Sequence, residues 1–375
     1  MRAHLSRGLW LVVFLVPALV GLLRGEHQST PDDPAALLVK QLGADAFAVR
    51  QDAGKKLIAL GEKAVPALRK AATSDADVEI RRRADELLLV ILPPTRKSKS
   101  IGLDMARIDG GAFLMGSSEG EKNRRPDEKR HGVTIKSPFY LGIFEVTQGE
   151  YQKVMKVNPS TFSTTGGGRN SVGAQDTSRF PVENVTWFDA IEFCNQLSKL
   201  DDLPPYYKID DIKRQGGAIG SAKVTVMGGN GYRLPTEAEW EFACRAVTEE
   251  PYHFGKSATG KLVNCKSSII PGGYGGGPAW RALDVTAPVG SYPANHFKLH
   301  DMHGNVGEWC WDYYDKDYYD NSPRVDPSGP ANGTHRVNRG GSWLVTEVSC
   351  RSASRFMQLP SEVTYTVGFR VARNP

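Results

Sequence analysis

The sequence predicts an α+β protein with two parts, a small helical segment near the N-terminus and a larger domain of short strands, long loops and a few helices. Two observations predict this division. Apolar residues recur at helical spacing up to about residue 92, whereas short alternating apolar runs separated by Gly, Asn and Pro clusters dominate beyond residue 105. Of the 375 residues, 40% are hydrophobic and 24% are charged. These values exclude wholesale disorder and a polytopic membrane protein.

The first 25 residues have the pattern of an export signal. Arg2 and Arg7 precede an apolar run over residues 9–23, which is shorter than the roughly 20 residues that span a bilayer comfortably. No small-x-small cleavage site follows near Arg24. Residues 1–25 are therefore predicted to be a signal peptide or an N-terminal membrane anchor. We expect an exported protein of bacterial type that is periplasmic, at the cell surface, or attached to the membrane by its N-terminus.

Residues 34–92 are predicted to form short helices, each with one apolar face. The three faces are formed by Val49, Ala53, Leu57 and Leu60, then by Val65, Leu68 and Ala72, and finally by Ala84, Leu87, Leu88 and Ile91. The phrasing AVRQDAGKKLIALGEKAVPALRKA resembles a HEAT-type repeat. Such helical pairs normally stack on neighbours, and roughly one and a half repeats are present. We therefore expect this segment to dock on the larger domain or on a partner.

Two prolines end the last of these helices, and the basic stretch after them predicts a linker over residues 93–104. The larger domain then extends over residues 105–374. Within it, an apolar run over residues 139–146 indicates a strand. Two helices are expected to begin near Thr186 and Thr236, because a threonine there can cap the first turn.

The larger domain contains several sequence blocks in a fixed order. They are RIDGGAFLMGSSEG from Arg107, PVENVTWFDAIEFCNQLS from Pro181, YRLPTEAEWEFACRA from Tyr232, LHDMHGNVGEWCWDYYD from Leu299, RVNRGGSW from Arg336 and the terminal GFRVAR. In these blocks the chain resembles the formylglycine-generating enzyme (sulfatase-modifying factor) family over residues 105–374. The resemblance implies an irregular α/β roll related to C-type lectins.

The block around Asp301 is the best candidate for a metal site. Its carboxylates flank a glycine-containing turn, and hard calcium ions prefer such oxygen ligands. The resemblance implies a structural calcium held by Asp301, by the backbone oxygens of Gly304 and Val306, and by the Glu308 carboxylate. The neighbouring His303 lacks a set of partner ligands and is expected to be a turn or core histidine.

A second calcium site is also implied by the resemblance. It would use Asn264 and the carbonyl of Cys265. Its other half falls in the glycine-rich residues 271–278, where this sequence departs from the family pattern.

The cysteines do not form an obvious framework. They are widely spaced and odd in number, at Cys194, Cys244, Cys265, Cys310 and Cys350. No C-x-x-C pair is present, so a thiolate zinc site is not predicted. Most of them adjoin large apolar residues and are expected to behave as small buried hydrophobes.

The catalytic segment of the resembled oxidase carries two nearby cysteines that hold copper and activate oxygen. Counting from the glycines before Ser342 puts Val345 where the first cysteine belongs and Cys350 where the second belongs. Counting from the Arg-rich end instead leaves Cys350 matched to neither. One thiolate cannot reproduce a two-thiolate copper site, so copper is not expected. The tryptophan expected before Glu308 is also replaced, by Gly307. Ser342 and Cys350 remain the candidate catalytic residues.

Two functions remain open. The first is a non-oxidase binding or scaffold domain that takes a protein, peptide or glycan ligand, with a sulfatase among the candidate partners. The alternative is an oxidase that converts a sulfatase active-site cysteine or serine to formylglycine. The net charge of +5 is spread thinly, with short basic runs at residues 81–83 and 96–99, so no nucleic-acid partner is expected.

Overall fold

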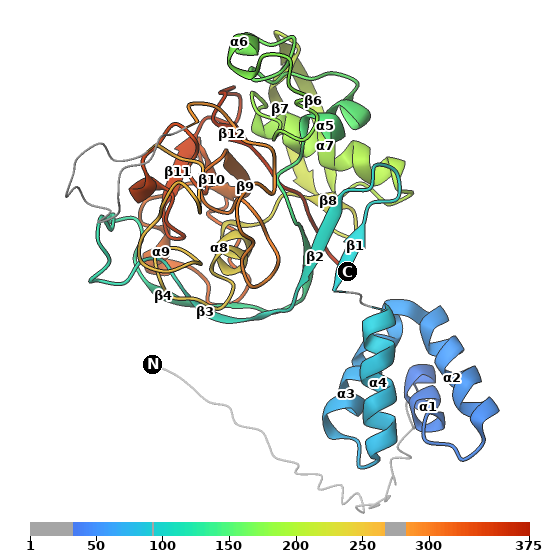
Figure 1. Cartoon of the computed structure of the whole chain (residues 1–375). Coiled ribbons are helices and arrows are strands. Elements are labelled where there is room, and N and C mark those ends of the chain that lie inside the picture. Colours follow the sequence, from blue (N-terminus) through green and yellow to red (C-terminus); the bar gives the residue numbers. More distant parts are fainter. Residues whose placement is uncertain (1–32, 92–93, 267–282) are drawn as a thin grey trace, which may run out of the picture. The chain divides into compact units, whose positions relative to one another are not determined.

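The computed structural model describes residues 33–91, 94–266 and 283–375 (Figure 1). The chain divides into two compact units, the first ending at Asp85 and the second beginning at Glu86. The predicted signal peptide or anchor over residues 1–25 lies outside the described residues. Among the helices in the described ranges, none has the length and apolar character needed to cross a membrane.

The N-terminal helices lie close to where the apolar spacing places them. They are α1 (Pro34–Gln41), α2 (Phe47–Leu60), α3 (Val65–Ser74) and α4 (Val78–Ile91), with the 3₁₀ turn η1 (Gly61–Ala64) between α2 and α3. Their buried side chains include Val39, Ala53, Leu57, Leu68 and Ala84. The face predicted for α2 is wrong at Val49, which is 40% exposed because it lies in the first turn, beside the helix start. The likeness to a HEAT repeat stays a prediction.

The second unit is built on two sheets. The first has the order β1-β2-β5-β13-β8, and all its neighbouring strands run antiparallel. Its strands are β1 (Thr95–Lys97), β2 (Asp104–Ile108), β5 (Phe139–Gly142), β8 (Tyr232–Arg233) and β13 (Ala372–Arg373). The predicted linker over residues 93–104 therefore contains an edge strand, since Thr95 pairs with Ala106 and Lys97 with Asp104.

The second sheet has the order β11-β10-β9-β12. Its strands are β9 (Gly307–Tyr313), β10 (Arg336–Arg339), β11 (Arg355–Gln358) and β12 (Val367–Gly368), and β12 pairs with β9 in parallel. Two separate hairpins complete the strands, β3 (Gly111–Met115) with β4 (His131–Ile135) and β6 (Tyr207–Gln215) with β7 (Ala218–Val226). The turn before β9 and the turn after β10 hold the predicted site residues.

The further helices of the second unit comprise longer ones that begin at capping threonines and two short ones that lack a side-chain cap. They are α5 (Gln148–Met155), α6 (Arg169–Val172), α7 (Trp187–Leu200), α8 (Glu237–Arg245) and α9 (Tyr318–Asn321), with a further 3₁₀ turn, η2 (Glu347–Ser349). The predicted starts of α7 at Thr186 and of α8 at Thr236 are confirmed, because both threonines form capping boxes. A third capping box at Thr147 starts α5, which sequence reasoning did not predict.

Helices α7 and α8 each supply a tryptophan to a separate apolar core. Trp187 of α7 packs in one core with Trp309 of β9, and Trp240 of α8 packs in the other with Cys310 of the same strand. All four side chains are fully buried. Strand β9 thus contributes to both cores and fixes the turn that precedes it.

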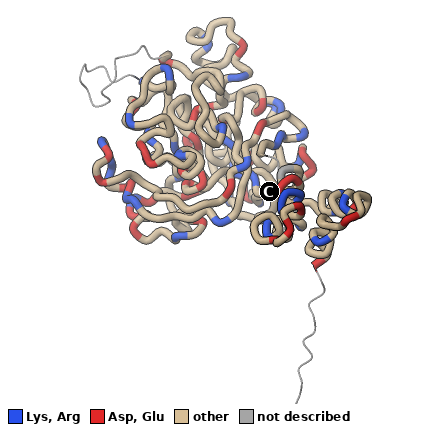
Figure 2. Tube along the Cα trace, turned by 60° about the horizontal axis from the view of Figure 1, so that its bottom comes forward, with Lys and Arg blue, Asp and Glu red and all other residues tan. Residues whose placement is uncertain are grey.

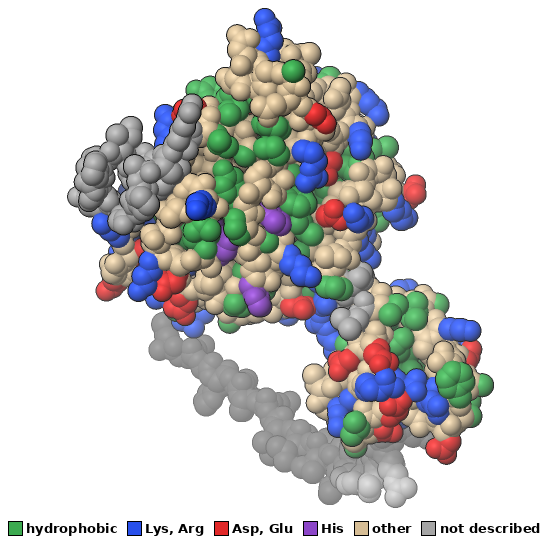
Figure 3. Space-filling model, viewed as in Figure 1, with side chains coloured by type: hydrophobic (Ala, Val, Ile, Leu, Met, Phe, Trp, Pro, Cys, Tyr) green, Lys and Arg blue, Asp and Glu red, His purple; other side chains and the backbone are tan. Residues whose placement is uncertain are grey.

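Charged residues of both signs alternate along the second unit rather than forming a stripe of one sign (Figure 2). On the face seen in Figure 3, exposed hydrophobic side chains form a band down the middle of this unit, with charged side chains mostly toward its edges.

Candidate functional site

Ser342 lies in a tight turn directly after β10. Gly340 and Gly341 before it have φ angles of 95° and 73°, a region that glycine adopts without strain. Ser342 is 4% exposed and lines a small cavity of about 200 Å³. The cavity lining is Gly307, Asn338, Gly341, Ser342, Val345, Phe356, Met357, Gln358, Thr366 and Val367. None of these described residues is a cysteine, and Val345, which the sequence count matched to the first cysteine of the resembled oxidase, is part of the lining.

Cys350, the second candidate catalytic residue, is fully buried and does not line the Ser342 cavity. A Cβ atom added to Gly341 would lie only 2.7 Å from the Cys350 Sγ. The thiol therefore packs tightly behind the glycine, in an apolar cluster with Tyr252, Val263 and Cys265. Ser342 and Cys350 are neighbours in space but belong to different surroundings.

The turn before β9 brings together three buried carboxylates. Glu308 accepts hydrogen bonds from Arg370, at 2.6 Å from Nε, and from Trp240 Nε1 at 2.7 Å. Asp301 accepts one from the Gly290 N–H at Oδ2, while its buried Oδ1 has no partner among the described residues. The third acid, Glu145, was missed at the sequence level, because it lies more than 150 positions earlier in the chain and belongs to no local pattern.

Glu145 is linked to this turn by hydrogen bonds to the two residues that follow Gly304. Its carboxylate accepts hydrogen bonds from Asn305 Nδ2 at 2.8 Å and from the Val306 N–H at 3.2 Å. Burial, with the nearby Asp301 and Glu308 charges, raises the pKa of Glu145 well above its ordinary value. Burial likewise raises the pKa of Asp301 to about 6. Both shifts report negative charge that the protein does not fully compensate.

This donor set fits the calcium that the resemblance implies. Three carboxylates face one guanidinium, that of Arg370, and one oxygen of Asp301 is buried without a partner. A hard cation would supply the missing positive charge, and Asp301 and the carbonyls of Gly304 and Val306 would be its oxygen ligands. Glu308 would share its carboxylate with Arg370. In the described part of the chain, no cluster of three or more His, Cys, Asp or Glu side chains suits a metal by itself, so backbone oxygens are required.

The second predicted calcium site is only half within the described residues. Asn264 donates from Nδ2 to the Val285 carbonyl at 3.0 Å and to Asn305 Oδ1 at 3.2 Å. Cys265 is buried beside it. The expected partners over residues 271–278 lie outside the described residues.

His303 is a core histidine whose two ring nitrogens are both engaged. Nδ1 donates to the Cys350 carbonyl at 2.7 Å, and Nε2 accepts from the His253 N–H at 3.2 Å. Burial, together with the adjacent His253, lowers the pKa of His303 to about 3, so the ring is neutral at physiological pH. Its role is to hold the Asp301 turn against the segment that contains Cys350.

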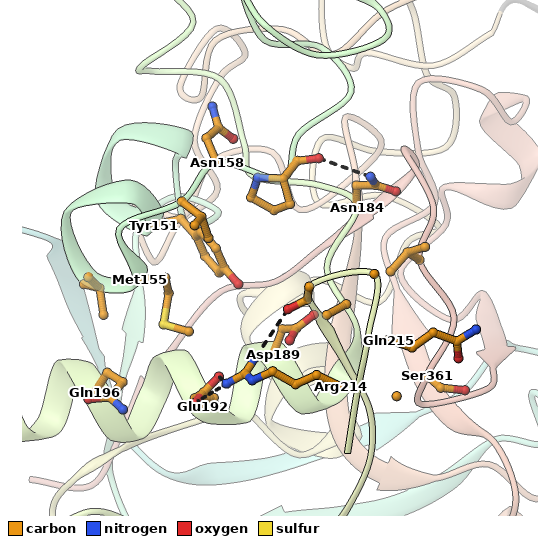
Figure 4. Close-up of a pocket in the computed structure, with 18 residues that line it drawn as sticks. Tyr151, Met155, Asn158, Asn184, Asp189, Glu192, Gln196, Arg214, Gln215 and Ser361 are labelled. Atoms are coloured by element: carbon orange, nitrogen blue, oxygen red, sulfur yellow. Dashed lines mark hydrogen bonds and ion pairs between the residues drawn. The ribbon is translucent and has the colours of Figure 1, made fainter. Parts of the chain in front are cut away.

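A larger cavity lies elsewhere, between α5, α7 and the β6–β7 hairpin, and has a volume of about 910 Å³ (Figure 4). Its lining combines apolar, amide and charged side chains, including Tyr151, Val154, Met155, Val157, Asn158, Asn184, Asp189, Glu192, Gln196, Arg214, Gln215 and Val363. Sequence reasoning missed it. The hairpin that walls it carries no motif, and the hairpin residues that line it begin at Arg214, 14 positions after α7 ends at Leu200.

Charged groups organise this cavity. Arg214 Nη2 donates to both oxygens of Glu192 at 2.8 Å, and Arg214 Nη1 lies 3.4 Å from the Gly217 carbonyl (Figure 4). Asp189 accepts backbone hydrogen bonds from Ile219 and Thr186. Burial raises the pKa of Asp189. With Glu192 neutralised by Arg214, the Asp189 carboxylate leaves one uncompensated negative charge when it is ionised.

Comparison with known proteins defines the class of this fold. The chain matches the model of the Sulfatase-modifying factor enzyme 1-like domain over residues 92–375. The second unit therefore belongs to the formylglycine-generating enzyme (sulfatase-modifying factor) family, and the predicted α+β fold of this type is confirmed. The match begins at residue 92 and so includes the predicted linker.

Individual relatives have different names. The chaperone protein LppX of Paenibacillus barcinonensis is 34% identical over 268 residues, which cover 67% of this chain and 82% of LppX. The formylglycine-generating enzyme of Thermomonospora curvata is 28% identical, covering 75% of this chain and 97% of that enzyme. Among solved structures, Treponema denticola variable protein 1 is similar, with a TM-score of 0.59 and 28% identity over 75% of this chain and 98% of that chain.

Proposed function

We propose that this chain is an exported ligand-binding member of the family and does not act as a formylglycine-generating oxidase. The observation that carries the proposal is the lining of the Ser342 cavity, where Val345 takes the place of a thiol. The single thiol of the segment, Cys350, is buried behind Gly341. A copper(I) site of the oxidase type needs two thiolates. This cavity does not provide that ligand pair, because a valine side chain cannot bind a metal.

The oxidase alternative is tested by incubating the purified full chain with copper(I), oxygen and a cysteine-containing sulfatase peptide. We expect no formylglycine by mass spectrometry and no tight copper binding. Formylglycine that depends on this protein and is lost in Cys350→Ser would overturn the proposal. Val345→Cys is the informative partner variant, because it adds a thiol to the cavity wall and, with Cys350 reduced, should raise copper(I) affinity relative to the wild-type protein.

The binding site of the proposal is the cavity between α7 and the β6–β7 hairpin. Its apolar wall of Val154, Met155 and Val363 suits the methylene chain of a side chain, and the Asp189 carboxylate at its floor favours a cationic end group. Side-chain amides such as Gln196 can pair with peptide groups. This chemistry favours a peptide segment of a protein partner that presents a lysine.

Fluorescence anisotropy with labelled peptide pools that differ only in one fixed residue tests this choice. The Lys pool should bind at least tenfold more tightly than the Glu pool. Glu192→Gln should alter binding because it releases Arg214. Glu249→Gln, a matched change at an exposed residue that is not part of the cavity lining, should leave binding unchanged. Equal binding of all pools, or binding only on a glycan array, would refute the peptide assignment.

A structural calcium at the Asp301 turn and export by residues 1–25 complete the proposal. Three buried carboxylates around one arginine support the calcium, and the apolar run after Arg7 supports export. Metal analysis of the native protein should find calcium without copper. The mass of the mature N-terminus should distinguish a cleaved signal from a retained membrane anchor.

A further inference from the structure

Cys265 and Cys350 meet in the second unit although 84 residues separate them in sequence. Both side chains are buried, with exposures of 1% and 0%, and their thiols lie within hydrogen-bonding reach of each other. The backbone holds their segments together, because the Lys266 N–H donates to the Val345 carbonyl at 2.8 Å and Lys266 pairs with Thr346 as a parallel bridge. Two independent contacts, one between backbones and one between thiols, thus fix the pair.

The surroundings of the pair are apolar. Tyr252, Ala258 and Val263 are buried in the same cluster, and Val345 packs against it. Two thiols in such a cluster gain only a weak hydrogen bond from each other, whereas a disulfide has no S–H group to satisfy and suits an apolar site.

We propose that Cys265 and Cys350 are joined by a disulfide in the mature protein. Two S–H bonds break and one S–S bond forms, and the two electrons and two protons pass to a disulfide oxidant, which leaves as a dithiol. Because both thiols are buried in the folded chain, the bond forms during folding in an oxidising compartment. This inference is independent of any ligand at the large cavity.

The other three cysteines are separated from this pair in the fold. Cys194 lies in the core of α7, while Cys244 and Cys310 lie in the core of α8. The polar neighbours of the Cys244 Sγ are Ser352 Oγ at 3.6 Å, the Met302 carbonyl at 3.7 Å and His303 Nε2 at 3.8 Å. An odd total of five is therefore accounted for by one bonded pair and three free buried thiols.

Peptide mapping of the full chain tests the proposal. The protein is purified without reductant from an oxidising compartment, denatured in acid, alkylated and digested. We expect a cross-linked peptide that joins Cys265 to Cys350, with alkylation at Cys194, Cys244 and Cys310. Alkylation of all five cysteines to the same extent, or a bond between any other two, would overturn it.

Thermal melting provides a second measurement. Reductant should lower the melting temperature on the order of 5 °C or more, since the bond closes a long loop. The shift should disappear in Cys265→Ser and remain in Cys194→Ser, which keeps the pair intact. Should Cys265→Ser fail to fold, the wild-type peptide map still decides, and a wild-type melting temperature unaffected by reductant would count against the bond.

Discussion

Buried carboxylates on helix α8 and buried carboxylates around the Asp301 turn have opposite surroundings. On α8, Glu237 accepts hydrogen bonds from Arg339 and Arg355, and Glu241 accepts them from Arg339 and Arg245. Although burial opposes it, these guanidinium groups hold the pKa values of both glutamates below their ordinary range.

Around the Asp301 turn and at Glu183 the balance is reversed. Glu145 and Asp301 share one arginine, Arg370, with Glu308. Glu183 is completely buried and accepts from the Phe162 N–H at 2.8 Å, but its Oε2 has no hydrogen-bond partner among the described residues. The comparison teaches that the α8 acids serve structure through internal ion pairs, whereas the others require a proton or a cation from outside.

The largest effect is expected from breaking the α8 network. Arg339→Met removes a guanidinium whose side chain is fully buried and leaves Glu237 and Glu241 without one of their partners. Loss of one member of a buried ion pair costs about 3–5 kcal/mol, and chemical denaturation should show a decrease of that size. Arg130→Met, which removes a partner of the exposed Glu249, is the control and should cost less than about 1 kcal/mol.

The next effect is a pH dependence at Glu183. Burial raises the pKa of Glu183 from 4.5 to about 7, so the folded protein binds this proton more tightly than the unfolded chain. The contribution of the group is fully present below pH 4.5 and is lost as pH rises through 7, with a total of about 3 kcal/mol. Glu183→Gln should flatten that part of the profile and stabilise the protein above pH 7. If the free energy of unfolding of the variant still falls over this pH range, another group causes the pH dependence.

Calcium should have a slightly smaller effect at the Asp301 turn. An ion that binds only the folded state raises the free energy of unfolding by about 2.7 kcal/mol at a concentration one hundred times its Kd. Calcium should therefore raise the melting temperature of the wild-type protein, and Asp301→Asn should abolish this rise. A chelator-treated protein that melts at the same temperature with and without calcium would contradict the assignment.

The smallest effect is expected at the surface. Asp320 pairs with Lys129, and both side chains are well exposed. Asp320→Asn should change the free energy of unfolding by less than about 1 kcal/mol, because solvent and salt screen such pairs. A larger loss, measured by denaturant titration, would show that exposed pairs matter here as much as buried ones.

The sequence was most informative where local chemistry decides structure. Thr186 and Thr236 predicted their helices correctly because a capping box is contained within four residues. Contacts between residues far apart in the chain could not be predicted from the sequence. Neither the approach of Glu145 to Asp301 nor that of Cys265 to Cys350 has a signal in one sequence, because each depends on how distant loops meet. The segment after residue 93 was likewise predicted as a linker because strand β1 has only three residues.

The short edge strand β1 matters for any attempt to study the second unit alone. A truncated protein that started at residue 105 would lose β1 and the first residue of β2, together with the hydrogen bonds from the Lys99 and Ser100 N–H groups to Asp201. The unpaired N–H and C=O groups of β2 would then face solvent and could template association between molecules. A truncated protein that starts at residue 94 keeps β1 paired with β2 and is the safer starting point for crystallisation.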